Sequence, residues 1–180
     1  MIDVSRVALV LVVAVVAALG GCDATANSTP APNRIKGMPA PVDSADRIAL
    51  LVPQVAVVNF DDQPGPDGVV AQVMLFKDYG KGPKSVLVTG EVDLMVFEGS
   101  KPKNINDAPK PFFSQTFTPA ELSRCIVGQY NTLWGYSLRA RWPAAPRTKN
   151  IWMLARYRPP SGSAVFSSPA EQRMPGAASR

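Results

Sequence analysis

The segment Ile151-Trp-Met-Leu-Ala-Arg-Tyr-Arg158 decides the expected fold, because two sets of side chains alternate along it. One set is Ile151, Met153, Ala155 and Tyr157, and the other is Trp152, Leu154, Arg156 and Arg158. Successive side chains of a β-strand point to opposite faces, so the pattern predicts a strand with one face in a core and arginines on the other. Residues 136–142 repeat it, with Tyr136, Leu138, Ala140 and Trp142 alternating with Ser137, Arg139 and Arg141.

Four more apolar runs are short enough for strands and are separated by turn residues. They lie in residues 54–60, 69–75, 86–96 and 164–166. Short alternating strands of this kind predict antiparallel sheets that bury one face.

One helix interrupts the strands. Thr118-Pro-Ala-Glu121 has the residues of a capping box, with threonine as N-cap and glutamate at the third helical position. Gly128 is expected to end the helix, which gives it residues 118–127. The predicted fold is therefore mainly β, an antiparallel β-sandwich with one short crossover helix. An open antiparallel sheet backed by that helix is the alternative.

The start of the chain has the layout of a lipoprotein signal peptide. After a short segment of six residues with one basic residue, Arg6, Val7 to Leu19 are thirteen consecutive apolar residues. A helix of that length spans roughly 20 Å, short of the roughly 30 Å of a bilayer core, which favours a cleaved signal. Leu19-Gly20-Gly21-Cys22 resembles a lipobox. We therefore expect residues 1–21 to be removed and a lipid on Cys22 to hold the protein on the exported side of a membrane, in the periplasm or at the cell surface.

The composition of the remaining chain predicts three parts. Residues 22–46 are rich in Pro, Ala and Ser and predict a flexible tether, residues 47–168 carry the sandwich, and residues 169–180 predict a disordered tail. Cys125 is the one cysteine besides Cys22. We therefore expect no intrachain disulfide and a buried Cys125 thiol.

The net charge of +5 hides an asymmetry. Residues 23–99 carry six Lys and Arg against ten Asp and Glu, whereas residues 100–180 carry twelve against three. A basic half often indicates nucleic-acid binding, but an exported protein is not expected to meet nucleic acid. The expected partners are the membrane, through the lipid on Cys22, and an envelope protein or polysaccharide.

The chain contains no histidine. That absence removes the commonest general base, the triads that need an imidazole, and most zinc sites. We therefore expect no catalytic residues, no cofactor and no enzymatic activity. The rival hypothesis is a carboxylate-dependent, glycosidase-like envelope hydrolase. Its acid and base would be Glu91 and Asp93, about 7 Å apart on one strand face, or the aspartates of the loop at residues 59–68.

The loop from Asn59 to Gly68 contains Asp61, Asp62 and Asp67, which are weak candidates for a calcium site. The spacing of these residues does not fit an EF-hand. The favoured interpretation is a turn in which aspartates bond the local backbone and glycines take positive φ.

Four arginines are candidates for a binding surface on the outer faces of two strands. They are Arg139, Arg141, Arg156 and Arg158. If the two strands pair, the arginines cluster and suit bidentate contacts to carboxylate or phosphate groups. The favoured alternative is a solvated sheet face balanced by Glu91 and Asp93.

Four segments of the chain have distinctive sequences: Asp61-Asp-Gln-Pro-Gly-Pro-Asp-Gly68, Gly90-Glu-Val-Asp-Leu94, Phe117-Thr-Pro-Ala-Glu-Leu122 and Ala155-Arg-Tyr-Arg-Pro-Pro-Ser-Gly162. Across about residues 48–168 they resemble a family of uncharacterised bacterial envelope lipoproteins. These motifs are turns and strand edges, so the resemblance implies a location and a small all-β fold, and no activity or site. The expected function is that of a membrane-anchored lipoprotein with a non-catalytic binding or structural module.

Overall fold

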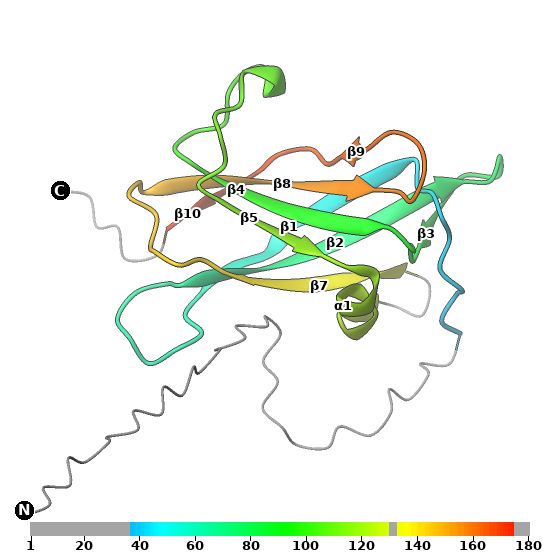
Figure 1. The fold of residues 1–180 in the computed structure, drawn as a ribbon, viewed down its shortest axis with the longest axis horizontal. Helices are drawn as coiled ribbons and strands as arrows, with labels where there is room; N and C mark the ends of the chain where they lie inside the picture. The colour runs from blue at the N-terminus through cyan, green and yellow to red at the C-terminus, as the bar shows by residue number, and fades with distance from the viewer. Residues whose placement is uncertain (1–36, 130–132, 175–180) are drawn as a thin grey trace, which may run out of the picture.

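Two antiparallel β-sheets pack against each other in the computed structural model, which describes residues 37–129 and 133–174 (Figure 1). The first sheet contains β1 (Arg47–Val58), β2 (Gly68–Asp78), β3 (Pro83–Val86), β6 (Ile126–Gln129) and β7 (Leu133–Arg141). The second contains β4 (Glu91–Glu98), β5 (Phe113–Phe117), β8 (Asn150–Arg158), β9 (Val165–Phe166) and β10 (Ala170–Arg173). The predicted mainly β sandwich is confirmed, and the alternative of a single open sheet is wrong.

The longest pairing of the second sheet, β4 with β8, is central, whereas that of the first sheet joins the edge strand β1 to β2. The first sheet runs β1-β2-β7-β6 with β3 beside β2, and the second runs β10-β8-β4-β5 with β9 beside β8. The described helices are α1 (Pro119–Arg124) and the 3₁₀ turn η1 (Ile105–Asp107). Because α1 follows β5 of the second sheet and precedes β6 of the first, it is the expected crossover helix.

The core lies between the sheets and is filled by alternate side chains of the central strands. From β7 it receives Trp134, Tyr136, Leu138 and Ala140, and from β8 it receives Ile151, Met153, Ala155 and Tyr157. The alternation predicted for these two strands is confirmed. Full burial of one such aliphatic side chain contributes about 1.5–3 kcal/mol, so the contact between the sheets is the main source of stability.

The start of α1 has the predicted geometry, but its end does not. Thr118 accepts a hydrogen bond from Glu121 N–H, and the Glu121 carboxylate accepts from Thr118 N–H at 2.8 Å, which completes the capping box. The helix ends at Cys125 rather than at Gly128. Gly128 instead lies in β6, opposite Trp134, because the β-branched pair Ile126-Val127 extends beside β7. Cys125 is half-buried and packs against the core, whereas we expected it to be buried.

The apolar run at residues 86–96 was expected to be one strand, and it is two. β3 ends at Val86 in the first sheet, and β4 begins at Glu91 in the second. The chain crosses between the sheets through buried Leu87 and Val88. Gly90 allows the crossing, because a Cβ there would lie 2.2 Å from the Arg158 carbonyl oxygen and 2.7 Å from the Tyr157 ring.

The first predicted strand, at residues 54–60, is displaced. β1 begins at Arg47 and ends at Val58, and its pairing with β2 shifts register between Leu51 and Ala56. Ile48 and Leu50 are buried whereas Ala49 and Leu51 are half-buried, but all four are apolar, so the sequence shows no alternation there. β1 is an edge strand, where a proline such as Pro53 is tolerated.

The fold extends beyond the predicted range of the domain, residues 47–168, at both ends. The tether was expected to reach residue 46, but Val42 N–H donates to the Leu87 carbonyl at 2.8 Å and Ala45 is buried. The tail was expected from residue 169, but β10 pairs with β8. Both segments contain few large apolar residues, so their composition did not indicate a fold. Backbone hydrogen bonds hold them in place.

The expected signal peptide lies outside the described residues. So do the lipobox residues Leu19, Gly20 and Gly21, the lipid site Cys22, most of the tether and the end of the tail. Within the described part of the chain, no helix is long and apolar enough to cross a membrane.

Candidate functional site

A buried carboxylate, Asp93, forms the centre of a charged cluster on the outer face of the second sheet. Arg156 Nε lies 2.8 Å from its Oδ2. Arg158 contributes Nε at 2.9 Å from Oδ2 and Nη2 at 2.9 Å from Oδ1. Thr116 Oγ1 donates to Oδ1 at 2.6 Å. Each carboxylate oxygen therefore accepts two hydrogen bonds, which occupies both of its lone pairs.

Strand pairing brings these groups together. Asp93 lies opposite Arg156 in the β4–β8 ladder and opposite Thr116 in the β4–β5 ladder. Arg158 lies two positions along β8 from Arg156, on the same face. A single residue of β4 thus links three strands.

The environment keeps Asp93 ionised. Burial by itself raises its pKa, but the hydrogen bonds from Arg158, Thr116 and Arg156 outweigh that effect and hold the pKa below its ordinary value. The same contacts raise the pKa of Arg158. A carboxylate with a lowered pKa and occupied lone pairs is a poor general acid, because a general acid must carry a proton near neutral pH.

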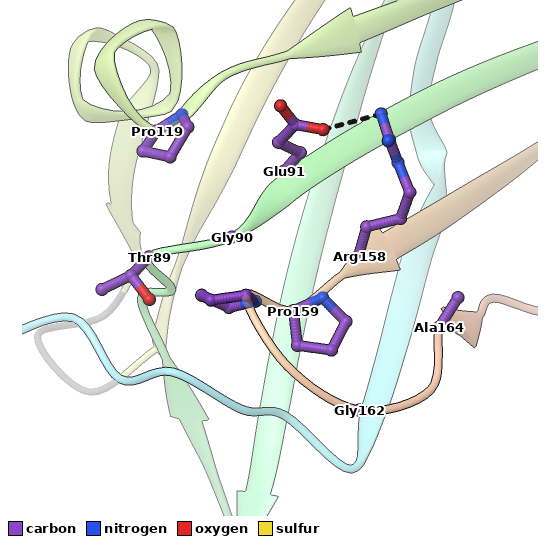
Figure 2. Close-up of a pocket in the computed structure, with 9 residues that line it drawn as sticks. Thr89, Gly90, Glu91, Pro119, Arg158, Pro159, Gly162 and Ala164 are labelled. Atoms are coloured by element: carbon purple, nitrogen blue, oxygen red, sulfur yellow. Dashed lines mark ion pairs between the residues drawn. The ribbon is translucent and has the colours of Figure 1, made fainter.

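Glu91 shares the face with Asp93, as expected, and borders an open pocket (Figure 2). Its Oε2 lies 2.8 Å from Arg158 Nη2. The pocket has a volume of about 520 Å³. It is lined by Thr89, Gly90, Glu91, Pro119, Arg158, Pro159, Pro160, Gly162 and Ala164. Below we call it the Glu91–Arg158 pocket.

The Glu91–Arg158 pocket bears on the rival hydrolase hypothesis. Within the described part of the chain, Glu91 is the carboxylate that lines it, and Asp93 is not among its lining residues. Retaining and inverting glycosidases use a pair of carboxylates that flank the scissile bond. Here the second carboxylate of the expected pair is held by Arg156 and Arg158.

The four arginines do not form one surface, which corrects the conditional expectation that they cluster. β7 belongs to the first sheet and β8 to the second. Because the core lies between the sheets, Arg139 and Arg141 face away from Arg156 and Arg158. Alternation fixes the face of a strand on which a residue lies, but not the neighbour of that strand.

Three of these arginines bind carboxylates, and two of them bind the carboxylates that the alternative interpretation named. Arg156 and Arg158 pair with Asp93, and Arg158 also pairs with Glu91. Arg141 pairs instead with Asp61 and Asp67, its Nε lying 2.8 Å from Asp67 Oδ2. The pairing of Arg141 was missed because those aspartates are more than seventy residues away along the chain.

The loop that contains these aspartates has the predicted local bonds. Asp61 Oδ1 accepts from Gln63 N–H at 2.9 Å, and Asp67 Oδ1 accepts from Phe60 N–H. Gly65 has a φ of 105°. Within the described residues, no group of three or more His, Cys, Asp or Glu side chains is arranged to hold a metal ion. Asp61 and Asp67 therefore serve the turn and Arg141.

A second apolar cluster lies on the outer face of the second sheet. Its buried members are Met95, Phe97, Trp152 and Leu154, with Ala108 of the β4–β5 loop packed against them. The Phe97 and Trp152 rings stack with centroids 3.9 Å apart. The loop thus covers a face that a sandwich often leaves to solvent, and alternation alone gave no signal for this cover.

Comparisons with protein families, with curated proteins and with solved structures found no match to this chain.

Proposed function

We propose that this protein is a lipid-anchored lipoprotein of the bacterial cell envelope, as its segments that resemble such proteins imply. The observation that carries the proposal is the lipobox-like run from Leu19 to Cys22, whose Leu19 is the last of thirteen consecutive apolar residues. A lipidated cysteine with two or three acyl chains gives lasting attachment, where one chain gives only reversible binding.

The domain that follows acts as a non-catalytic binding or structural module. This part of the proposal is supported by Asp93, whose oxygens are occupied by Arg156, Arg158 and Thr116. The contact site we assign is the Glu91–Arg158 pocket, where proline rings provide apolar walls beside a charged pair. The partner is an envelope protein or polysaccharide.

Metabolic labelling with a fatty-acid analogue tests the anchor. The natural chain and the matched control Cys125→Ser are expected to incorporate label, whereas Cys22→Ser is expected to lose it and accumulate as precursor. Label retained in Cys22→Ser would overturn the lipoprotein proposal.

Site-specific photocrosslinking in cells tests the module. A photoreactive residue in place of Ala164, inside the pocket, is expected to trap one defined partner. The same residue in place of exposed Arg139, on the other sheet, is the control. Equal crosslinking from both positions would overturn the assigned contact site. Glycan cleavage by the purified protein that is lost in Glu91→Gln would overturn the non-catalytic proposal and favour the hydrolase.

A further inference from the structure

We infer that the tip of the β2–β3 hairpin, residues 79–84, docks on anionic lipid headgroups of the membrane that carries the anchor. The inference rests on the proposed lipid anchor for its geometry. The docking itself can be measured without the lipid.

The chain enters the domain beside the end of β2, next to the turn of this hairpin. Asp46 N–H donates to the Phe76 carbonyl at 2.9 Å. Lys77 Nζ donates to Ser44 Oγ at 2.7 Å. Figure 1 shows the blue segment before β1 and the β2–β3 hairpin at the same end of the sandwich. The hairpin therefore lies at the end of the sandwich where a tether would join the domain.

The proposed anchor would hold this end toward the membrane. Sixteen positions separate Cys22 from Met38, which packs against the core in the described part of the chain. A tether of that length spans on the order of 25 Å. The opposite end of the sandwich would then face away from the bilayer.

The groups at the tip suit a phospholipid interface. Tyr79 is 51% exposed. Lys81 and Lys84 are also exposed, and no ion pair among the described residues involves either of them. Tyrosine is enriched at the membrane–water interface, where its apolar ring and its polar hydroxyl both lie at the level of the headgroups. Lysines near an anionic leaflet are attracted to it.

The carboxylates near the hairpin are directed at other groups. Asp46 Oδ2 accepts from Asp78 N–H at 2.7 Å, and Asp78 Oδ1 accepts from Gly80 N–H at 2.8 Å. Asp43 Oδ1 accepts from the Thr89 hydroxyl at 2.7 Å. These bonds direct the carboxylates to backbone and hydroxyl donors. Lys81, in the turn, and Lys84, opposite Lys77 in β3, therefore keep charges that can meet an external anion.

The expected affinity is low, which suits a second contact beside an anchor. One lysine near an anionic surface is worth about a fivefold gain in binding. A tether raises the local concentration of the tip at the membrane to the millimolar range, so weak binding is enough to orient the domain. The attraction weakens as salt shortens the Debye length, which is about 10 Å at 0.1 M.

Vesicle co-sedimentation of the mature chain, residues 22–180, tests the docking. Cys22→Ser is included so that no lipid contributes to binding. At low salt the chain is expected to bind vesicles of equal phosphatidylglycerol and phosphatidylcholine at least fivefold better than pure phosphatidylcholine vesicles. High salt is expected to remove the difference. Tyr79→Ser is expected to weaken binding by a smaller factor than loss of the lysines.

Two charge-matched variants decide whether the hairpin is responsible. Lys81→Glu with Lys84→Glu is expected to lower binding to anionic vesicles by at least tenfold. Lys101→Glu with Lys103→Glu makes the same change of charge in the β4–β5 loop, and is expected to change binding less than twofold. Circular dichroism checks that both variants fold.

Two outcomes would overturn the inference. One is equal binding of the chain to anionic and neutral vesicles, and the other is an equal loss in the two charge-matched variants. Neither outcome depends on acylation. Fatty-acid labelling tests the proposed lipid anchor separately.

Discussion

The guanidinium of Arg158 meets the carboxylate of Asp93 through two parallel contacts, Nε to Oδ2 and Nη2 to Oδ1, each 2.9 Å long. This bidentate pair joins β8 to β4 beside the Asp93–Arg156 contact. Asp93 is 1% exposed, whereas the side chains of both arginines are about 35–41% exposed. The negative charge is therefore buried in the sheet while the positive charges reach solvent.

Asp93→Asn should destabilise the domain. It removes the buried negative charge and replaces one of the two oxygens that accept from Arg156 and Arg158 with an amide nitrogen, which cannot accept. Hydrogen bonds to charged groups are worth about 1.5–3 kcal/mol each, and the exposed arginines can recover part of that loss from water. We expect the free energy of unfolding to fall by roughly 2–3 kcal/mol in urea titrations at neutral pH.

Glu91→Gln is the matched control for Asp93→Asn. It removes the more exposed partner of Arg158, a surface ion pair worth at most about 1 kcal/mol. Equal losses in the two variants would contradict the central role of Asp93.

The stability of the domain should depend on pH through Asp93. Its pKa in the fold is below the ordinary value of 3.8, although burial opposes that direction. A depressed pKa gives stability that is present above the unfolded pKa and is lost as the pH falls through the folded value. The free energy of unfolding should therefore decrease as the pH falls below about 5, and it should decrease less in Asp93→Asn. Acid titrations with the same slope in both chains would argue against this assignment.

Short-range patterns in the sequence were enough to predict much of the fold. The alternation in residues 136–142 and 151–158 identified which side chains enter the core, because a strand repeats every two residues. Thr118 and Glu121 identified the helix start, because a capping box is complete within four residues. The end of the helix depended on the pairing of Ile126 with Tyr136, which no local pattern contains.

The candidate site was less accessible to prediction. The pattern placed Arg156 and Arg158 correctly on the outer face, and it placed Glu91 and Asp93 on one face as well. It gave no means of knowing that β7 and β8 lie in different sheets, since a connection of eight residues can serve a hairpin or a crossing between sheets. Ion pairs between distant segments therefore had to come from the structure.

Thr118→Ala should cost about 1 kcal/mol of the free energy of unfolding. The variant removes the oxygen that accepts from Glu121 N–H, and it also removes the hydroxyl that donates to the Glu121 carboxylate at 2.7 Å. Thr118→Ser keeps that oxygen and should stay within a few tenths of the natural value. Urea midpoints measure both variants, and a serine variant as unstable as the alanine variant would point away from capping.

Calcium should leave the melting temperature of the mature chain unchanged, because Arg141 already holds the carboxylates of Asp61 and Asp67. A site that bound only the folded state would stabilise it by about 2.7 kcal/mol at a hundredfold excess over Kd, which is several degrees in a domain of this size. Arg141→Gln is the informative companion, since it frees both carboxylates and leaves the turn bonds of Asp61 and Asp67 in place. Stabilisation that arises only in Arg141→Gln would agree with neutralisation by the guanidinium. A saturable rise in the natural chain, lost in Asp61→Asn with Asp62→Asn, would instead show that calcium displaces Arg141 and that the loop is a cation site.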